Sequence, residues 1–233
     1  MTQAGNVTYN GPEDLPATIP VFPLAGVLLL PRGQLPLNIF EPRYLDMIAE
    51  AMRGARLIGV LQPKIVSNQL DTPIVESPTE RVSLSDVGCV GRITQYAETG
   101  DGRVLVTLVG ITRFKLVAEI PTKLAFRTCR IDVEPFMEDF SVGSGNDEVD
   151  RKQLLDTFKA YLEARNLEAD WQGIDRASNE SLVNTLSMMS PYGPAEKQAL
   201  LEARSLKERA DILVAVTELA LANEAGDAGS TLQ

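Results

Sequence analysis

The side chains that most often carry catalysis are scarce in this chain. It contains no histidine in 233 residues, although histidine is the usual general base near neutral pH and the commonest ligand of transition metals. Its two cysteines, Cys89 and Cys129, are too far apart in sequence for a metal knuckle or a disulfide framework. Serine–histidine and cysteine–histidine mechanisms are therefore excluded, and carboxylate chemistry is what remains.

Phosphate-binding loops are missing as well. No G-x-x-x-x-G-K-[ST] sequence occurs in the chain, and the glycines at 143 and 145 lack the lysine and the preceding apolar strand of such a loop. The segment from Gly88 to Gly91 matches the G-x-x-G spacing of an RNA-binding loop. It stands in an apolar run without flanking lysines, which favours close backbone approach within a strand. We expect no cofactor and no metal site.

The most distinctive polar cluster is the one around Glu41. This residue stands between Phe40 and Pro42, and its simplest role is a capping carboxylate for a helix that begins at Pro42. Arg43 and Tyr44 follow directly. Either they fix this helix against the strands through the guanidinium and the phenol, or they face a groove that takes a partner peptide.

A second candidate surface is made of thioether and aromatic groups. Methionine adapts to varied apolar partners, so such residues could line a binding surface, although ordinary core packing explains them equally well. The residues concerned are Phe136, Met137, Met188 and Met189.

Charge argues against nucleic acid as a partner. The formal net charge is −10 and both halves of the chain are acidic, whereas phosphate binding needs a basic surface. An RNA-binding face would have to form locally around Arg92, Arg113, Lys115 and Arg127. No apolar run reaches the roughly 18 residues that span a bilayer, and residues 1–4 lack the basic region and apolar stretch of a secretory signal, so we expect none. We expect a cytoplasmic protein that does not contact membranes.

The first part of the chain predicts short strands around one helix. Proline removes a hydrogen-bond donor from a sheet, so the proline-rich stretch 16–38 must form short or edge strands, best placed at 19–22 and 35–39. Apolar residues then repeat at helical spacing between Pro42 and Gly54.

A hairpin follows, and beyond it the spacing of the apolar residues changes from that of strands to that of helices. Residues 90–96 alternate apolar and polar side chains, and after a Gly-Asp-Gly turn the apolar run 104–109 returns as the second strand. Residues 138–150 are rich in small and acidic side chains, which predicts a linker, and after them the apolar residues repeat at helical spacing. We therefore predict an α+β fold with a β domain at 15–140, a helical bundle at 141–225 and a disordered tail at 226–233.

Several sequence blocks occur in a fixed order. They are I-P-V-F-P-L (19–24), V-L-L-L-P (27–31), L-P-L-N-I-F-E-P-R-Y (35–44), G-C-V-G-R-I (88–93), G-I-T-R-F (110–114) and S-P-Y-G-P-A-E-K-Q-A-L-L-E (190–202). Together they closely resemble the substrate-binding N-terminal domain of Lon proteases, over roughly residues 17–222. The last block resembles a helical segment of short bacterial members.

The resemblance implies a PUA-like β pseudo-barrel with one inserted helix, followed by a helical bundle, used to engage protein substrates. No ATPase P-loop and no Ser-Lys protease sequence accompanies it here. We therefore expect a non-catalytic, free-standing adaptor that binds unfolded segments or a protein partner.

Two alternatives stay open. A carboxylate-only hydrolase would need two acidic side chains that converge in a pocket. An RNA-binding PUA-like module would need a contiguous Lys/Arg face on the barrel.

Overall fold

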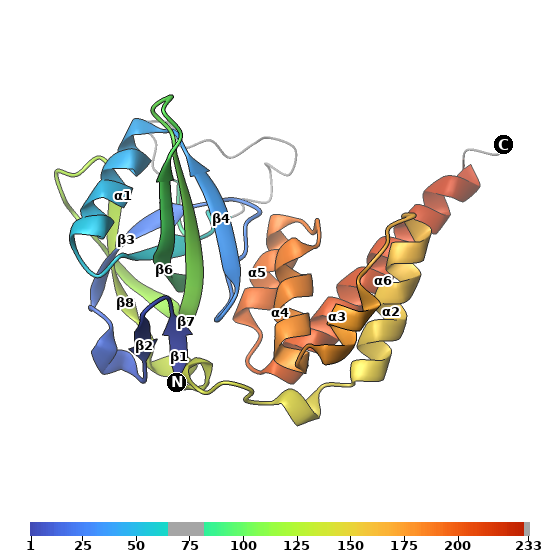
Figure 1. Cartoon of the computed structure of the whole chain (residues 1–233). Coiled ribbons are helices and arrows are strands. Elements are labelled where there is room, and N and C mark those ends of the chain that lie inside the picture. The colour runs from blue at the N-terminus through green and yellow to red at the C-terminus, as the bar shows by residue number, and fades with distance from the viewer. Residues whose placement is uncertain (65–81, 231–233) are drawn as a thin grey trace. The chain divides into compact units, whose positions relative to one another are not determined.

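The computed structural model describes residues 1–64 and 82–230 (Figure 1). Side chains are described through residue 223. The chain divides into two compact units. The β unit contains Met1–Val142 and Pro191–Leu201, and the helical unit contains Gly143–Ser190 and the chain from Glu202 onward. The predicted α+β class is confirmed, with a mostly closed ring of strands in the β unit.

The ring is built from one six-stranded sheet with the order β4-β7-β6-β5-β3-β8 and a further pairing of β8 with β7. The long β7 makes closure possible, because its first half pairs with β4 and its second half with β8. The strands are β3 (Thr18–Pro23), β4 (Gln34–Ile39), β5 (Leu57–Leu61), β6 (Val87–Glu98), β7 (Val104–Ile120) and β8 (Arg127–Asp132).

β4 has a partner on one side only among the described strands. It lies antiparallel to β7, with Pro36 opposite Thr107. Proline has no N–H to donate, so Pro36 must occupy a position whose backbone points away from β7. Backbone direction alternates along an antiparallel strand, so Gln34 and Asn38 also point their N–H and C=O groups to the open edge.

Glycines permit the close packing inside the ring. A Cβ on Gly88 would lie 2.6 Å from the ring of Phe114, and a Cβ on Gly91 would lie 2.8 Å from the side chain of Leu29. Phe114 itself is fully buried in the core of the β unit. The interpretation of this G-x-x-G segment as a close approach within a strand, here β6, is therefore confirmed.

One helix of the β unit follows β4 directly. α1 (Pro42–Arg53) begins at its proline, as the sequence predicts, and buries Tyr44, Met47, Ile48 and Ala51 along one face. Arg53 in the last turn suits the helix dipole.

Residues 191–201 belong to the β unit, whereas the sequence assigned them to the helical bundle. They include most of α5 (Pro194–Glu202). The side chain of Gln62 donates to the Pro194 carbonyl at 3.0 Å and to Oε1 of Gln198 at 3.1 Å, and Gln198 donates to the Val87 carbonyl at 3.1 Å. Such polar contacts between residues far apart in sequence leave no periodic signal.

The β unit also begins earlier than residue 15. β1 (Thr2–Ala4) and β2 (Val7–Tyr9) form a hairpin, and the short helix η1 (Pro12–Asp14) follows. Ala4 and Tyr9 are buried in the core cluster. The hairpin was missed because three-residue strands are too short to establish an alternating pattern.

The helical unit contains η3 (Asn146–Glu148), α2 (Arg151–Ala164), α3 (Trp171–Arg176), α4 (Asn179–Met189) and α6 (Leu206–Ser230). Asp150 and Ser178 accept hydrogen bonds from the first turns of α2 and α4. Ser205 accepts the Glu208 N–H at 3.1 Å, as its S-x-x-E spacing predicts. Because α6 is continuous to Ser230, helix replaces the expected disorder at 226–230, and 231–233 lie outside the described residues.

Candidate functional site

The ring of strands has a seam between β3 and β4. β8 pairs with β3 only as far as Val21, so Phe22 and Pro23 have β5 on one side and no described strand on the other. The open edge of β4 is the other side of this seam. A pocket of about 350 Å³, which we call the seam pocket, is lined by residues 22–25 and 37–41 together with Arg43, Tyr44 and Pro63.

The first turn of α1 supplies the charged part of the seam pocket. Glu41 occupies the N-cap position, but its carboxylate makes no capping hydrogen bond. It accepts instead from Nε of Arg43 at 3.0 Å and pairs with Nη2 at 2.9 Å. The prediction that the Glu41 carboxylate caps α1 is therefore wrong. The guanidinium fork of Arg43 offers this carboxylate stronger, charge-assisted hydrogen bonds than the backbone amides of the first turn do.

Aromatic packing anchors this turn to β3. The Arg43 guanidinium lies 4.6 Å from the centre of the Tyr44 ring, and that ring lies 4.2 Å from the ring of Phe22. Tyr44 is buried, so it has the structural role that the sequence suggested as one of two options. Phe40 behaves differently, since 62% of it is exposed at the rim of the pocket.

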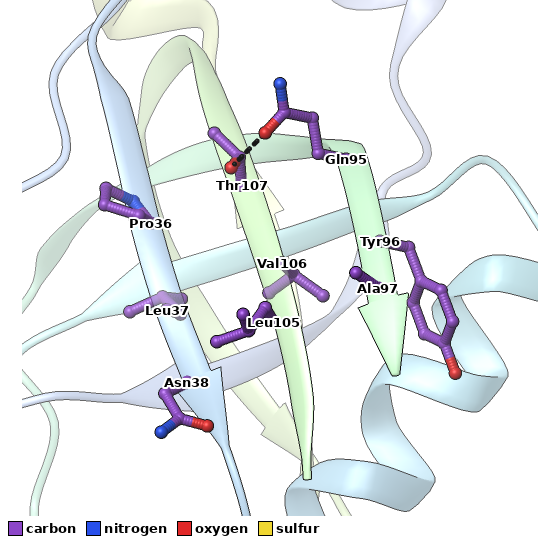
Figure 2. A pocket seen from close by; sticks show the side chains of 9 residues that line it. All are labelled: Pro36, Leu37, Asn38, Gln95, Tyr96, Ala97, Leu105, Val106 and Thr107. Atoms are coloured by element: carbon purple, nitrogen blue, oxygen red, sulfur yellow. Dashed lines mark hydrogen bonds between the residues drawn. The ribbon is translucent and has the colours of Figure 1, made fainter. Parts of the chain in front are cut away.

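A second depression lies on the outer face of the same strands. Figure 2 shows this face pocket, of about 450 Å³, across β4, β7 and β6. Leu105 is 46% exposed there, and Thr107 donates a hydrogen bond to Gln95 at 2.9 Å beside it. Tyr96 points away from β7. The lining consists of residues 36–38, 95–97 and 105–107, none of which carries a charge at neutral pH.

The structure brings together four of the eight predicted site residues. Phe40, Glu41, Arg43 and Tyr44 all line the seam pocket. The remaining four do not contribute to either lining.

Those four residues lie in other elements. Phe136 and Met137 belong to η2 (Glu134–Phe140) in the β unit, where the Arg113 guanidinium lies 4.7 Å from the centre of the Phe136 ring. Met188 and Met189 end α4 in the helical unit, and Met189 is 78% exposed. A common apolar surface made of these four residues stays a prediction.

Sequence reasoning missed the β3 side of the seam pocket. Phe22, Pro23, Leu24 and Pro63 contribute apolar lining, yet none has a reactive group that would attract attention. The signal that could have found Phe22, Pro23 and Leu24 is that they belong to one of the ordered sequence blocks. The I-P-V-F-P-L block and the L-P-L-N-I-F-E-P-R-Y block are the two walls of one pocket.

Three of the four residues proposed for an RNA-binding face make contacts within the fold. Arg113 is buried and pairs with Asp139 at 2.9 Å, and Arg127 pairs with Glu119 at 2.7 Å with its own side chain 8% exposed. Arg92 donates to the Ala55 carbonyl. These three guanidiniums are engaged within the fold whereas Lys115 is exposed, so an RNA-binding face at these four residues stays a prediction.

The seam and face pockets also lack a pair of carboxylates. Glu41 is the one acidic residue in the two linings, and it is bound to Arg43. No group of three metal-ligating side chains occurs within residues 1–64 and 82–223, whose side chains are described. None of the described helices combines the length and apolar character needed to cross a bilayer.

Residues 18–217 match the family model for the substrate-binding domain of the ATP-dependent protease La, or Lon. The chain belongs to this family. The sequence-based resemblance to the Lon substrate-binding domain is thus confirmed, and the match is to that domain of the protease.

Curated relatives are full Lon proteases. The chain is similar to the Lon protease of Flavobacterium johnsoniae, with 28% identity over 204 residues, which is 85% of this chain and 23% of that protein. It is also similar to the Lon protease of Parabacteroides distasonis, with 32% identity over 210 residues, 86% of this chain and 24% of that protein. The chain spans about a quarter of the length of the curated relatives it matches.

Solved structures share the fold. A Lon N-terminal domain protein from Xanthomonas campestris aligns with a TM-score of 0.57 at 19% identity, covering 85% of this chain and 97% of that one. The N-terminal domain of the Mycobacterium avium complex Lon protease aligns with a TM-score of 0.60 at 18% identity, covering 86% and 98%. At these identities the likeness establishes the fold of the Lon N-terminal domain.

Proposed function

We propose that this chain is a protein-recognition module that binds exposed apolar segments of unfolded proteins, or of a protein partner, in the seam pocket. The observation that carries the proposal is the position of Phe40. A phenylalanine that is 62% exposed at the rim of an apolar pocket buries little of its ring in the free protein, and it offers a contact surface to a ligand.

The electrostatics of the seam pocket suit an uncharged apolar ligand. Its two charged side chains, Glu41 and Arg43, neutralise each other. Every other lining residue is uncharged. A strongly charged ligand would therefore lose hydration without gaining a partner in the pocket.

Binding of this kind is expected to be weak for any single segment. A pocket of about 350 Å³ holds one or two side chains, and a disordered ligand loses conformational entropy when it is ordered. Weak binding fits a module that samples many different segments.

The test is fluorescence anisotropy with α-lactalbumin whose disulfides have been reduced and capped with iodoacetamide, compared with the same protein in its native state. We expect the unfolded form to bind and the native form not to bind. Phe40→Glu places a charge in the apolar contact and should weaken binding by at least about tenfold.

Leu124→Glu is the matched control. Leu124 is also an exposed apolar residue of the β unit, at 47%, but it lies between β7 and β8 and does not line the seam pocket. This variant should bind as the unaltered protein does. Equal binding of native and unfolded α-lactalbumin, or equal losses in the two variants, would refute the proposal.

A further inference from the structure

We propose that the ligand pairs with the open edge of β4 as an added strand, so that an extended, uncharged segment of another protein is held by backbone hydrogen bonds as well as by the seam pocket. This inference rests on the proposed function and specifies the conformation and side-chain pattern of the ligand.

The first argument is the unused backbone of β4. Gln34 and Asn38 direct N–H and C=O groups away from β7, and Pro36 directs a C=O group the same way. No described strand pairs with this edge. An extended peptide that adds to such an edge gains main-chain hydrogen bonds that do not depend on its sequence.

The second argument is the position of the seam pocket. Its lining includes residues 37–39 of β4 but no residue of β7 or β6, so it lies on the open side of β4. A strand placed along this edge would therefore lie over the pocket. Side chains that it points to the ring interior would meet Phe22 and Tyr44, which favours apolar residues at those positions.

The outer face of β4 determines which ligand side chains are favoured at the alternate positions of the added strand. On that face the neighbours of an added strand are Pro36 and Asn38 of β4, with the face pocket beyond them. Polar amide and hydroxyl groups from Asn38, Gln95 and Thr107 mix there with apolar carbon. Side chains alternate along a strand, so the favoured ligand alternates apolar residues with small polar ones.

Pro36 argues for a different protein as occupant over a second copy of this chain. If two β4 edges paired with each other, both strands would lack an N–H donor at Pro36, so the ladder would lose hydrogen bonds from both sides. An incoming segment with all its N–H groups intact can still donate to the Pro36 carbonyl. Edge prolines are a common device against pairing between like strands.

The probe is a short, capped, fluorescently labelled peptide of alternating valine and threonine, measured by anisotropy against the full chain. Two N-methylated versions block the N–H groups of alternate residues, one version for each edge of the peptide. Side chains are the same in both. We expect one version to lose at least about tenfold in affinity while the other binds like the parent, since only one edge faces β4.

Pro36→Ala tests strand addition by a change in the protein. The direction of the change in peptide affinity distinguishes strand addition from binding by apolar contact alone. The substitution restores an edge N–H while removing apolar surface from β4. Strand addition predicts roughly threefold to tenfold tighter binding, the value of one net hydrogen bond, whereas binding by apolar contact alone predicts weaker binding. Sedimentation of the unaltered chain, with and without the parent peptide, reports whether it dimerises.

The outcomes separate the two proposals. If the parent peptide binds and Phe40→Glu weakens it, but both N-methylated peptides bind alike and Pro36→Ala does not tighten binding, strand addition is wrong and the proposed function stands. Dimerisation of the unaltered chain that the parent peptide reverses would also overturn the proposed occupant, because the β4 edge would then pair with a second copy. No binding of the peptide or of unfolded α-lactalbumin would overturn both.

Discussion

The ring of Tyr44 packs 4.2 Å from the ring of Phe22, and this contact joins the first turn of α1 to the end of β3. It lies at the base of the seam pocket, where both residues contribute to the lining. The neighbouring aromatic residue, Phe40, is exposed instead. One aromatic side chain therefore packs within the site, and the other is the residue that the proposed function assigns to ligand contact.

Truncating these two aromatic residues should separate stability from binding. Tyr44→Ala removes a buried ring and should lower the free energy of unfolding by about 3 kcal/mol. Phe40→Ala removes an exposed ring and should change it by less than about 0.5 kcal/mol while weakening the binding of unfolded α-lactalbumin. Urea denaturation followed by circular dichroism measures the first effect. A large destabilisation by Phe40→Ala would contradict this division of roles.

Glu41→Gln tests the pairing of Glu41 with Arg43. Because the carboxylate does not cap α1, its loss should change the free energy of unfolding by less than about 0.5 kcal/mol. It removes the negative charge that pairs with Arg43 at the pocket, so peptides with a glutamate should bind more tightly relative to uncharged ones. Anisotropy with a matched pair of glutamate and glutamine peptides measures this selectivity. Destabilisation of α1 without a change in selectivity would restore the capping role.

The buried ion pair of Arg113 with Asp139 is a strong test of the β unit. Asp139 accepts from Nε of Arg113 at 2.9 Å and from its backbone N–H at 2.8 Å. Asp139→Ala removes the buried carboxylate that balances the charge of this guanidinium and should cost about 3–5 kcal/mol of unfolding free energy.

Asp86→Ala is the control for that variant, because Asp86 pairs with Lys64 at 2.9 Å in an exposed position of the same unit. Surface pairs contribute little, so its cost should stay below about 1 kcal/mol. Similar costs for the two variants in urea denaturation would show that burial does not decide the contribution of the pair.

Cys129 should be unreactive in the folded protein. Burial raises the pKa of its thiol to about 11, the Glu119 charge adds to this effect, and Arg127 opposes it. Only the thiolate reacts, and its population increases as pH rises toward the pKa, so at pH 8 almost none is present. Ellman's reagent should label Cys129 slowly until denaturant is added. Fast labelling of a Cys89→Ala variant under native conditions would contradict a closed β3–β8 sheet.

The local parts of the fold could be predicted because the signals are local. Pro42 and Gly54 bound α1, and alternation around a Gly-Asp-Gly turn predicts the hairpin of β6 and β7. The two walls of the seam pocket were recognised as sequence blocks, although the sequence alone did not predict that they face each other.

What escaped prediction depends on contacts between distant residues. Gln62 and Gln198 join α5 to the β unit across 136 positions of sequence, which no periodic pattern reports. Glu41 had the right position for a cap but a stronger partner two residues away. When several nearby groups can bind the same side chain, geometry decides which of them does. The residue types alone do not specify that geometry.

Hydrogen exchange measured by mass spectrometry tests the central claim most directly, namely that polypeptide segments bind along the seam between β3 and β4. The chain is compared free and saturated with unfolded α-lactalbumin. We predict new protection in peptides that cover residues 22–25 and 34–44, with none in α2 or α6 of the helical unit. Protection confined to the helical unit, or no protection at saturating ligand, would contradict the account.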